Sequence, residues 1–286
     1  MKKLILAIGA LMAAIVLASC DDDSGQQSPS PTTPPIDAPE GYTLVWSDEF
    51  ESPTLDPLNW QCETGGNGWG NQEKQYYTDG DNIRIEDGCL VIEARKQTVG
   101  NNAYTSGRIT SKGLYEFTYG YVEARISLPS GAGTWPAFWM LGANNSTARW
   151  PLCGEIDIME HVGSEPTMIS HAAHTKEKNG SVGNNWSNRQ YVDGIEEGFH
   201  TFALEWKKEA DQGDDCLTFY IDGVESATLW EPHGAASTTV KWPFNKSFFI
   251  VLNLALGGSW GGAIDDSIFD NPVEMKVDYV RLFKKL

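Results

Sequence analysis

Three carboxylates stand within the six residues 155–160, which read EIDIME. Isoleucines alternate with Glu155 and Asp157, which is typical of a β-strand with one buried face and one open face. In a regular strand, Glu160 would point toward the side that the two isoleucines bury. A buried carboxylate without a partner costs several kcal/mol, so a regular strand is a poor interpretation of this segment.

One extra residue in the strand, a β-bulge at Ile158-Met159, removes the conflict. Bulges re-aim side chains next to active sites. With the bulge, Glu155 and Glu160 share a face at four strand steps, about 13 Å between Cα atoms. Side chains that lean together would bring the carboxyl groups to about 5–6 Å, as in retaining rather than inverting glycosidases. Asp157, between them, can share a proton with one glutamate and separate the two pKa values.

Two other interpretations of the three acids are open, a solvated strand face and a Ca²⁺ site. Aliphatic residues between the acids and aromatic residues nearby disfavour a solvated face. Calcium takes oxygen ligands, but its sites usually wrap a loop around the ion, whereas a strand holds its side chains in a line. The segment therefore favours catalysis.

The rest of the domain reads as strands that would position these acids. Alternation of apolar and polar residues recurs at 121–128, 202–206 and 217–221, and no long window has a helical stripe. Asp-Gly pairs supply turns at 79–80, 87–88, 193–194 and 222–223. Many short antiparallel strands in one long domain predict an all-β sandwich of two sheets.

The tryptophans indicate a sugar-binding cleft. Trp69 and Trp260 stand in glycine-rich segments, and Trp135 and Trp139 lie in one strand-like segment. Core packing explains most single tryptophans. Flanking glycines, however, leave an indole without packed neighbours and let a ligand approach the backbone. Flat indoles beside Asn, Gln and Arg suit the faces and hydroxyl edges of sugar rings.

The amino-terminal residues predict export. Residues 1–19 have a basic start, an apolar run and small residues before Cys20, which indicates a secretory signal of the lipoprotein type with Cys20 lipidated. An ordinary secretory signal is the alternative. Residues 20–39 are acidic and rich in proline, so we expect a disordered tether before one domain at 40–286. Acids directly after Cys20 resemble surface-export signals, which suggests an outer-membrane lipoprotein exposed at the cell surface.

The composition excludes some partners. A formal net charge of −18 argues against nucleic acid and, less firmly, against strongly anionic polysaccharides. We expect a monomer that meets the membrane only through its lipid. The sequence leaves open whether Cys62, Cys89, Cys153 and Cys216 form disulfides.

The motif GEIDIMEH (154–161), preceded by TWPAFWMLG (134–142), resembles the catalytic region of glycoside hydrolase family 16, above all its bacterial laminarinases. Further stretches agree with that family: VWSDEF (45–50), NGWGNQE (67–73), TSGRI (105–109), FYIDG (219–223), NLALGG (253–258) and VDYVR (277–281). The resemblance implies a β-jelly-roll sandwich with a cleft on its concave sheet. It also implies retaining endo-hydrolysis of β-1,3-glucan, with mixed-linkage glucan or agar-type galactan as alternative substrates. A non-catalytic glucan-binding lipoprotein is disfavoured because all three acids are present.

The same resemblance assigns residues. Glu155 would be the nucleophile, Glu160 the general acid and then base, and Asp157 the assisting carboxylate. Residues expected to bind substrate are Asn71, Arg108, Trp135, Trp139, His174 and Trp260, although His174 could equally be structural. His171, three residues before His174 in a strand, should face the opposite way, so we do not read the pair as metal ligands.

The family often carries a structural Ca²⁺, which would use Glu49, the carbonyl of Gly88 and Asp278 here; no cofactor is expected for catalysis. The chain departs from the laminarinase pattern at two places. Gly261 stands where proline is common, and Tyr121 where arginine is common. Either departure could change the shape of the substrate subsites.

Overall fold

The computed structural model describes residues 36–208, 215–233 and 241–286. All of these described residues belong to one compact unit. The predicted signal peptide, the lipidation site Cys20 and most of the tether lie outside the described residues. Within the described ranges no helix has the length and apolarity needed to cross a membrane.

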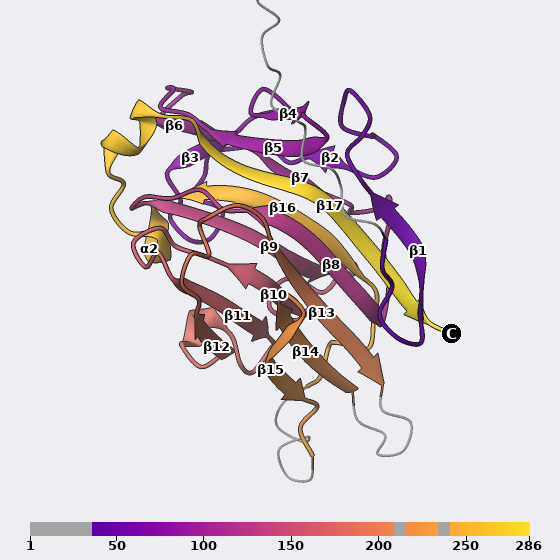
Figure 1. The fold of residues 1–286 in the computed structure, drawn as a ribbon. Helices are drawn as coiled ribbons and strands as arrows, with labels where there is room; N and C mark the ends of the chain where they lie inside the picture. Colours follow the sequence, from indigo (N-terminus) through magenta and orange to yellow (C-terminus); the bar gives the residue numbers. More distant parts are fainter. Residues whose placement is uncertain (1–35, 209–214, 234–240) are drawn as a thin grey trace, which may run out of the picture. The chain divides into compact units, whose positions relative to one another are not determined.

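Two antiparallel sheets form the domain, as predicted (Figure 1). The larger sheet has eight strands among the described residues, and β1 (Tyr42–Asp48) pairs with β17 beside the main order. That order is β15 (Val224–Trp230), β14 (Asp215–Ile221), β13 (His200–Lys208), β8 (Gly120–Ser127), β17 (Val273–Lys285), β5 (Cys89–Ala94) and β4 (Ile83–Glu86).

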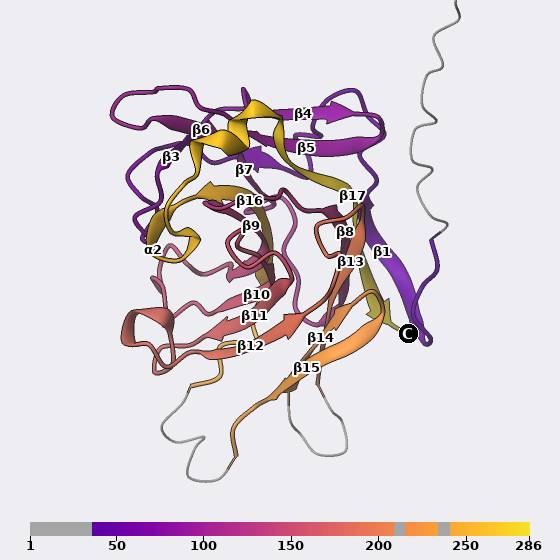
Figure 2. The same cartoon turned by 60° about the vertical axis from the view of Figure 1, so that its left-hand side comes forward.

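The smaller sheet has seven strands in the described part of the chain, and β16, β9, β10, β11 and β12 follow one another in Figure 2. Its full order is β12 (Trp186–Tyr191), β11 (Met168–His174), β10 (Glu155–Glu160), β9 (Thr134–Gly142), β16 (Phe248–Leu256), β7 (Arg108–Thr110) and β2 (Gln61–Cys62). The remaining elements are the parallel pair β3 (Gln75–Tyr77) and β6 (Tyr104–Ser106), the helical turn α2 (Gly258–Gly261), and the 3₁₀ turns η1 (Gly180–Val182) and η2 (Asp266–Asp270).

The core lies between the two sheets and follows the predicted alternation. On β8, the side chains of Val122, Ala124 and Ile126 are fully buried in it. Ile156 and Ile158 of β10 enter the same core from the smaller sheet. Burying apolar surface on both inner faces holds the sheets together, which leaves the outer face of the smaller sheet available for polar side chains.

Two of the predicted Asp-Gly turns close hairpins. Asp87 and Gly88 join β4 to β5 with φ angles of 52° and 74°, and Asp222 and Gly223 join β14 to β15 with φ angles of 49° and 72°. Positive φ at both central residues is the type I′ geometry that Asp-Gly favours.

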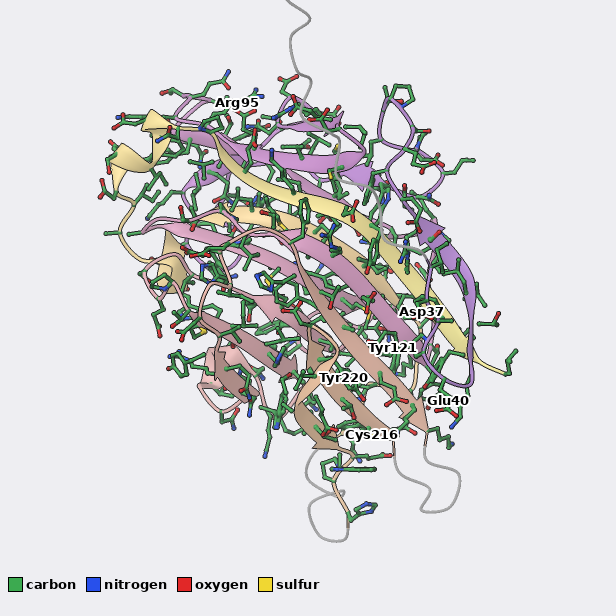
Figure 3. The ribbon with its side chains drawn as sticks, viewed as in Figure 1. Asp37, Glu40, Arg95, Tyr121, Cys216 and Tyr220 are labelled. Atoms are coloured by element: carbon green, nitrogen blue, oxygen red, sulfur yellow. The ribbon has the colours of Figure 1, made fainter. Side chains whose placement is uncertain are left out.

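Tyr121 lies on the outer face of the larger sheet, together with Tyr220 of β14 (Figure 3). The two rings are 5.8 Å apart. Tyr121 also packs on Phe283 and Tyr42. It does not line the cleft described below, so the expectation that this departure would change the substrate subsites is wrong for Tyr121. Resemblance gives the position of a residue in the sequence but not the sheet or the face on which its side chain lies.

The cysteine thiols are packing groups. Cys62, Cys89 and Cys153 are unoxidised, and the last two are buried. Burial raises the pKa of Cys89 and of Cys153 to about 11, so both are protonated thiols at neutral pH.

Candidate active site

The β10 strand carries a bulge at the predicted place. Asp157 pairs with Trp139 of β9, but the next pair is Met159 with Phe138, so Ile158 is the extra residue. The register with β11 shifts over the same segment. Ile156 and Ile158 are fully buried, and Met159 joins them in the core. The prediction of a bulge that keeps both isoleucines inside is confirmed.

Because of this bulge, Glu155, Asp157 and Glu160 all line one cleft of about 730 Å³ on the outer face of the smaller sheet. The cleft crosses strands β7, β16, β9, β10, β11 and β12. All of the residues predicted to bind substrate also line it: Asn71, Arg108, Trp135, Trp139, His174 and Trp260. The structure thus brings nine predicted residues together, and their individual roles remain predictions.

Glu160 is held by a tryptophan. The indole nitrogen of Trp135 donates a hydrogen bond to Oε1 of Glu160 at 3.1 Å. Burial and the nearby charge of Asp157 raise the pKa of Glu160 well above its usual value, although the Trp135 hydrogen bond lowers it. Glu160 therefore holds its proton to a higher pH than an exposed glutamate does.

Glu155 has a positively charged neighbour, Arg108, that Glu160 lacks. Burial and Asp157 raise its pKa to about 8, while His174, Arg108 and a hydrogen bond from the Trp150 side chain act in the opposite direction. These stabilising contacts favour the ionised form of Glu155 over that of Glu160. Burial also raises the pKa of Asp157 to about 8. The pKa values of all three acids are thus raised, and Glu155 is the one whose contacts with Arg108 and Trp150 favour ionisation.

Glu155, Asp157 and His174 form a close cluster whose donor atoms all lie within 4.8 Å of one another, a spacing that could hold a metal ion. The hydrogen bonds of His174 favour another use. Its Nδ1 accepts the backbone N–H of Gly180 at 3.0 Å, so the proton of a neutral ring is on Nε2. Nε2 lies 3.1 Å from Oδ2 of Asp157 and 3.6 Å from Oε1 of Glu155. A protonated nitrogen cannot ligate a metal, so this ring supplies positive potential to the carboxylates.

The Oδ2 atom of Asp157 is also a buried oxygen with no hydrogen-bond partner among the described residues. Its distance of 3.1 Å from Nε2 of His174 is close enough for electrostatic attraction. An unpaired carboxylate oxygen that lines a cleft is ready to accept a hydroxyl group of a ligand.

Arg108 is sandwiched between two indoles. Its guanidinium lies 4.7 Å from the ring centre of Trp69 and 4.8 Å from that of Trp139. Nε donates to Oε2 of Glu63 at 2.6 Å, which fixes the plane of the group. Stacking and charge together give this wall of the cleft a rigid cation flanked by flat apolar surfaces.

A directed chain of hydrogen bonds supports the same wall. Trp139 donates to Oδ1 of Asn253 at 2.7 Å, and Asn253 donates to the Tyr77 hydroxyl at 3.2 Å. Tyr77 then donates to Oε2 of Glu73 at 3.1 Å. Every donor has one acceptor along this path, so the orientation of the Trp139 indole is set from behind.

Several cleft residues were missing from the predicted set. Trp69 was noted in its glycine-rich loop, but Glu73, Trp150, Arg189 and Asn253 had no assigned role, although all line the cleft. A sequence signal exists for Glu73, which alternates with Gln75 and Tyr77 as one face of a strand would. The ring of Trp150 lies 5.9 Å from that of His174, a contact between a loop and a strand that no local pattern reveals.

Trp260 differs in one respect from its prediction. Its glycine-rich segment forms the turn α2, and its ring packs edge-on against Trp135 at 5.5 Å and 81°. The expectation that flanking glycines leave it without packed neighbours is therefore wrong. Trp135 lies 125 residues earlier in the sequence, so no local pattern could reveal this contact. Gly261, next to Trp260, leaves room for it, because a Cβ at Gly261 would stand 3.5 Å from the Trp135 side chain.

The residues predicted to bind calcium have other partners here. Both carboxylate oxygens of Glu49 accept from Arg281, at 3.0 and 2.7 Å, and Oδ2 of Asp278 accepts from Arg125 at 2.6 Å. Gly88 lies in the β4–β5 turn. A cation would compete with two guanidinium groups for these oxygens, so the donor set does not fit calcium in this arrangement, and the site stays a prediction.

Comparison with known proteins places the chain. Residues 70–281 match the family described as Glycosyl hydrolases family 16. The chain is 41% identical to a beta-glucanase of Rhodothermus marinus over 85% of each chain. The laminarinase structure from Flavobacterium sp. UMI-01 is 42% identical, with a TM-score of 0.75 over 85% of this chain and all of that one. SCLam, a non-specific endo-β-1,3(4)-glucanase, is 38% identical, with a TM-score of 0.78 over 90% of this chain and 97% of that one.

Proposed function

Because the chain belongs to glycosyl hydrolases family 16 and is a glycoside hydrolase, we propose that it cuts β-1,3-glucan chains internally with retention of configuration. The observation that supports this proposal most directly is the bulged β10 strand, which presents Glu155, Asp157 and Glu160 on one cleft face. A retaining mechanism needs two carboxyl groups on opposite sides of one linkage, one ionised and one protonated.

In the first step, the Glu155 carboxylate attacks the anomeric carbon of the glucosyl unit bound in the cleft. The bond from that carbon to the glycosidic oxygen breaks, and Glu160 transfers its proton to the departing oxygen. In the second step, Glu160 takes a proton from water while the water oxygen bonds to the anomeric carbon. The glycosyl–Glu155 bond breaks as the bond to the water oxygen forms, which returns both glutamates to their starting states.

The surroundings support these roles. Arg108 and the Trp150 hydrogen bond favour ionised Glu155, whereas Asp157 disfavours ionisation of both glutamates. The unpaired oxygen of Asp157 can accept a hydrogen bond from a sugar hydroxyl next to the glycosidic bond that is cleaved. Indoles on both sides of the acids offer apolar faces to neighbouring glucosyl rings.

The decisive experiment is a substrate panel with the purified protein. Laminarin, mixed-linkage β-1,3-1,4-glucan and agarose are incubated separately, and new reducing ends and product lengths are measured. We expect short oligosaccharides from laminarin, with retained configuration by NMR. The Glu155→Gln variant should lose at least about 10³-fold in kcat, and an active Glu155→Gln variant would refute the assignment.

Mixed-linkage glucan is the second candidate substrate. It is favoured by the 38% identity to SCLam, which is described as non-specific toward β-1,3 and β-1,3-1,4 linkages. The mechanism and the residues would be the same. If kcat/KM for mixed-linkage glucan exceeds the value for laminarin, mixed-linkage glucan is the preferred substrate.

We also propose that the enzyme acts at the cell surface from a lipid anchor on Cys20, with residues 20–39 as the tether. The support is the sequence pattern of residues 1–23 alone. Labelling with a fatty acid analogue in a bacterial host, with Cys20→Ala as the control, tests the anchor. Digestion of intact cells with an external protease tests the surface location.

A further inference from the structure

His171 stands opposite the bulge of β10. Ala172 pairs with Asp157 and Ser170 pairs with Glu160, so one residue of β11, His171, faces two residues of β10. Its side chain is fully buried between the sheets, and its ring stacks on Phe219 at 4.9 Å and 26°. The histidine therefore lies behind the catalytic strand, on the face away from the cleft.

The imidazole contacts the bulge itself. Nδ1 of His171 lies 2.6 Å from the carbonyl oxygen of Ile158, the residue without a Cα partner on either neighbouring strand. A carbonyl can only accept, so Nδ1 carries the proton. A buried carbonyl that lacks a donor costs about 1–3 kcal/mol. The histidine removes this cost at the position where the strand leaves its regular ladder.

The other ring nitrogen ties the bulge to the opposite sheet. Nε2 of His171 lies 2.8 Å from the hydroxyl of Ser226 on β15. Burial lowers the pKa of His171 to about 4, so the ring is neutral and Nε2 can only accept. The single hydroxyl proton of Ser226 lies between Nε2 of His171 and the carbonyl oxygen of Phe219, which is 3.0 Å away. Ile158, His171 and Ser226 thus form one hydrogen-bonded connection between the two sheets.

We propose that His171 is a positioning residue that maintains the β10 bulge and thereby keeps Glu160 on the cleft face. This inference rests on the proposed function, in which Glu160 must reach the glycosidic oxygen. Without the donor on Nδ1, the Ile158 carbonyl would turn to find another partner, and the two residues that follow would turn with it. A misplacement of about 1 Å in a reacting group can cost about 10²-fold in rate.

The test uses substrates that differ in their need for an acid. A glucan oligosaccharide has a poor leaving group that Glu160 must protonate. In a dinitrophenyl β-glucoside of the same length, the dinitrophenolate leaves without protonation. We expect His171→Leu to lower kcat/KM on the oligosaccharide about 10²-fold and on the aryl glycoside less than about threefold, because kcat/KM of the aryl glycoside reports only the first step, which there needs no acid. His171→Asn, whose amide nitrogen can occupy the place of Nδ1, should recover most of the loss.

Controls separate positioning from general loss of stability. Ile169→Val, a mild change in the same buried strand, should lower the Tm with no difference between the two substrates. Ser226→Ala should give a smaller but parallel loss to His171→Leu, and it serves as the test variant if His171→Leu does not fold. The inference would be overturned if folded His171→Leu lost the same factor on both substrates, or if His171→Asn recovered none of the loss.

Failure of the inference about His171 can be distinguished from failure of the proposed function. If the wild type hydrolyses none of the glucans, the proposed function fails. The bulge is then tested by the crystal structure of His171→Leu, where an unchanged Ile158 carbonyl and Glu160 side chain would reject the role of His171. If the wild type is active and the variant matches it, the function stands and the inference alone fails.

Discussion

The indole N–H of Trp135 points at Oε1 of Glu160 from the neighbouring strand, at 3.1 Å. Asp157 acts on the same carboxyl group in the opposite sense, because its negative charge disfavours ionisation of Glu160. One neighbour thus stabilises the carboxylate and the other stabilises the acid. The pH at which Glu160 loses its proton depends on the balance between the two.

Removal of the Trp135 donor should move the alkaline limb of the pH profile upward. Trp135→Phe keeps an aromatic ring but deletes the hydrogen bond that stabilises ionised Glu160, so the pKa of Glu160 rises. The measurement is kcat/KM as a function of pH, which reports the free enzyme. A limb that stays in place or moves to lower pH would show that Trp135 does not act on Glu160.

Removal of the Asp157 charge should move the same limb downward. Asp157→Asn deletes the negative charge that raises the pKa values of Glu155 and Glu160, so both should fall toward the ordinary range. We expect the whole bell-shaped profile to shift toward acid and kcat to fall about 10-fold or more, as the glutamates lose their assisting group. An unchanged profile would contradict the electrostatic role of Asp157.

The raised pKa of Glu155 predicts a stability penalty that grows with pH. The folded state holds this proton up to about pH 8, whereas the unfolded chain loses it near pH 4.5. Stability therefore falls as pH rises between these values. Glu155→Gln should raise the Tm at pH 8 by at least about 2 °C and leave it nearly unchanged at pH 4.5.

Calorimetry of the wild type and Glu155→Gln at several pH values measures this difference. Glu51→Gln, at an exposed position, is the matched control and should show no pH-dependent gain. A Glu155→Gln variant that is less stable than the wild type at pH 8 would mean that Glu155 is not an energetic burden on the fold.

The stacked guanidinium of Arg108 should matter for binding. Arg108→Lys keeps the charge but loses the flat contacts with Trp69 and Trp139 and the geometry of the Glu63 hydrogen bond. We expect KM for laminarin to rise about 10-fold, with kcat within about threefold, as for a lost binding contact. Glu63→Gln keeps both stacks and should have a smaller effect. A drop in kcat without a change in KM would place Arg108 in the chemistry instead.

The catalytic strand could be predicted because its chemistry conflicts with its periodicity. A glutamate out of phase with two buried isoleucines permits few solutions, and a bulge at Ile158-Met159 is the one that the structure has. The two-sheet sandwich could be predicted from alternation and Asp-Gly turns, because both are local properties of the chain.

Other contacts depend on register between distant strands, which local patterns do not determine. The sequence indicated that His171 and His174 face opposite ways, and they do. It did not indicate that His171 meets the Ile158 carbonyl, because that contact requires the pairing of β10 with β11. The arginine partners of Glu49 and Asp278 were hidden likewise, since Arg281 and Arg125 reach them across paired strands.

The proposed nucleophile and the proposed acid stand on β10, which has a hydrogen-bonded strand on each side and a core beneath it. Much of the sugar-facing surface instead comes from irregular segments, among them the Trp69 loop, the Trp150 loop and α2. Substitutions or insertions in those segments can accumulate over evolution without disturbing the bond-breaking machinery. A change from one polysaccharide substrate to another therefore requires changes in these loops rather than in β10.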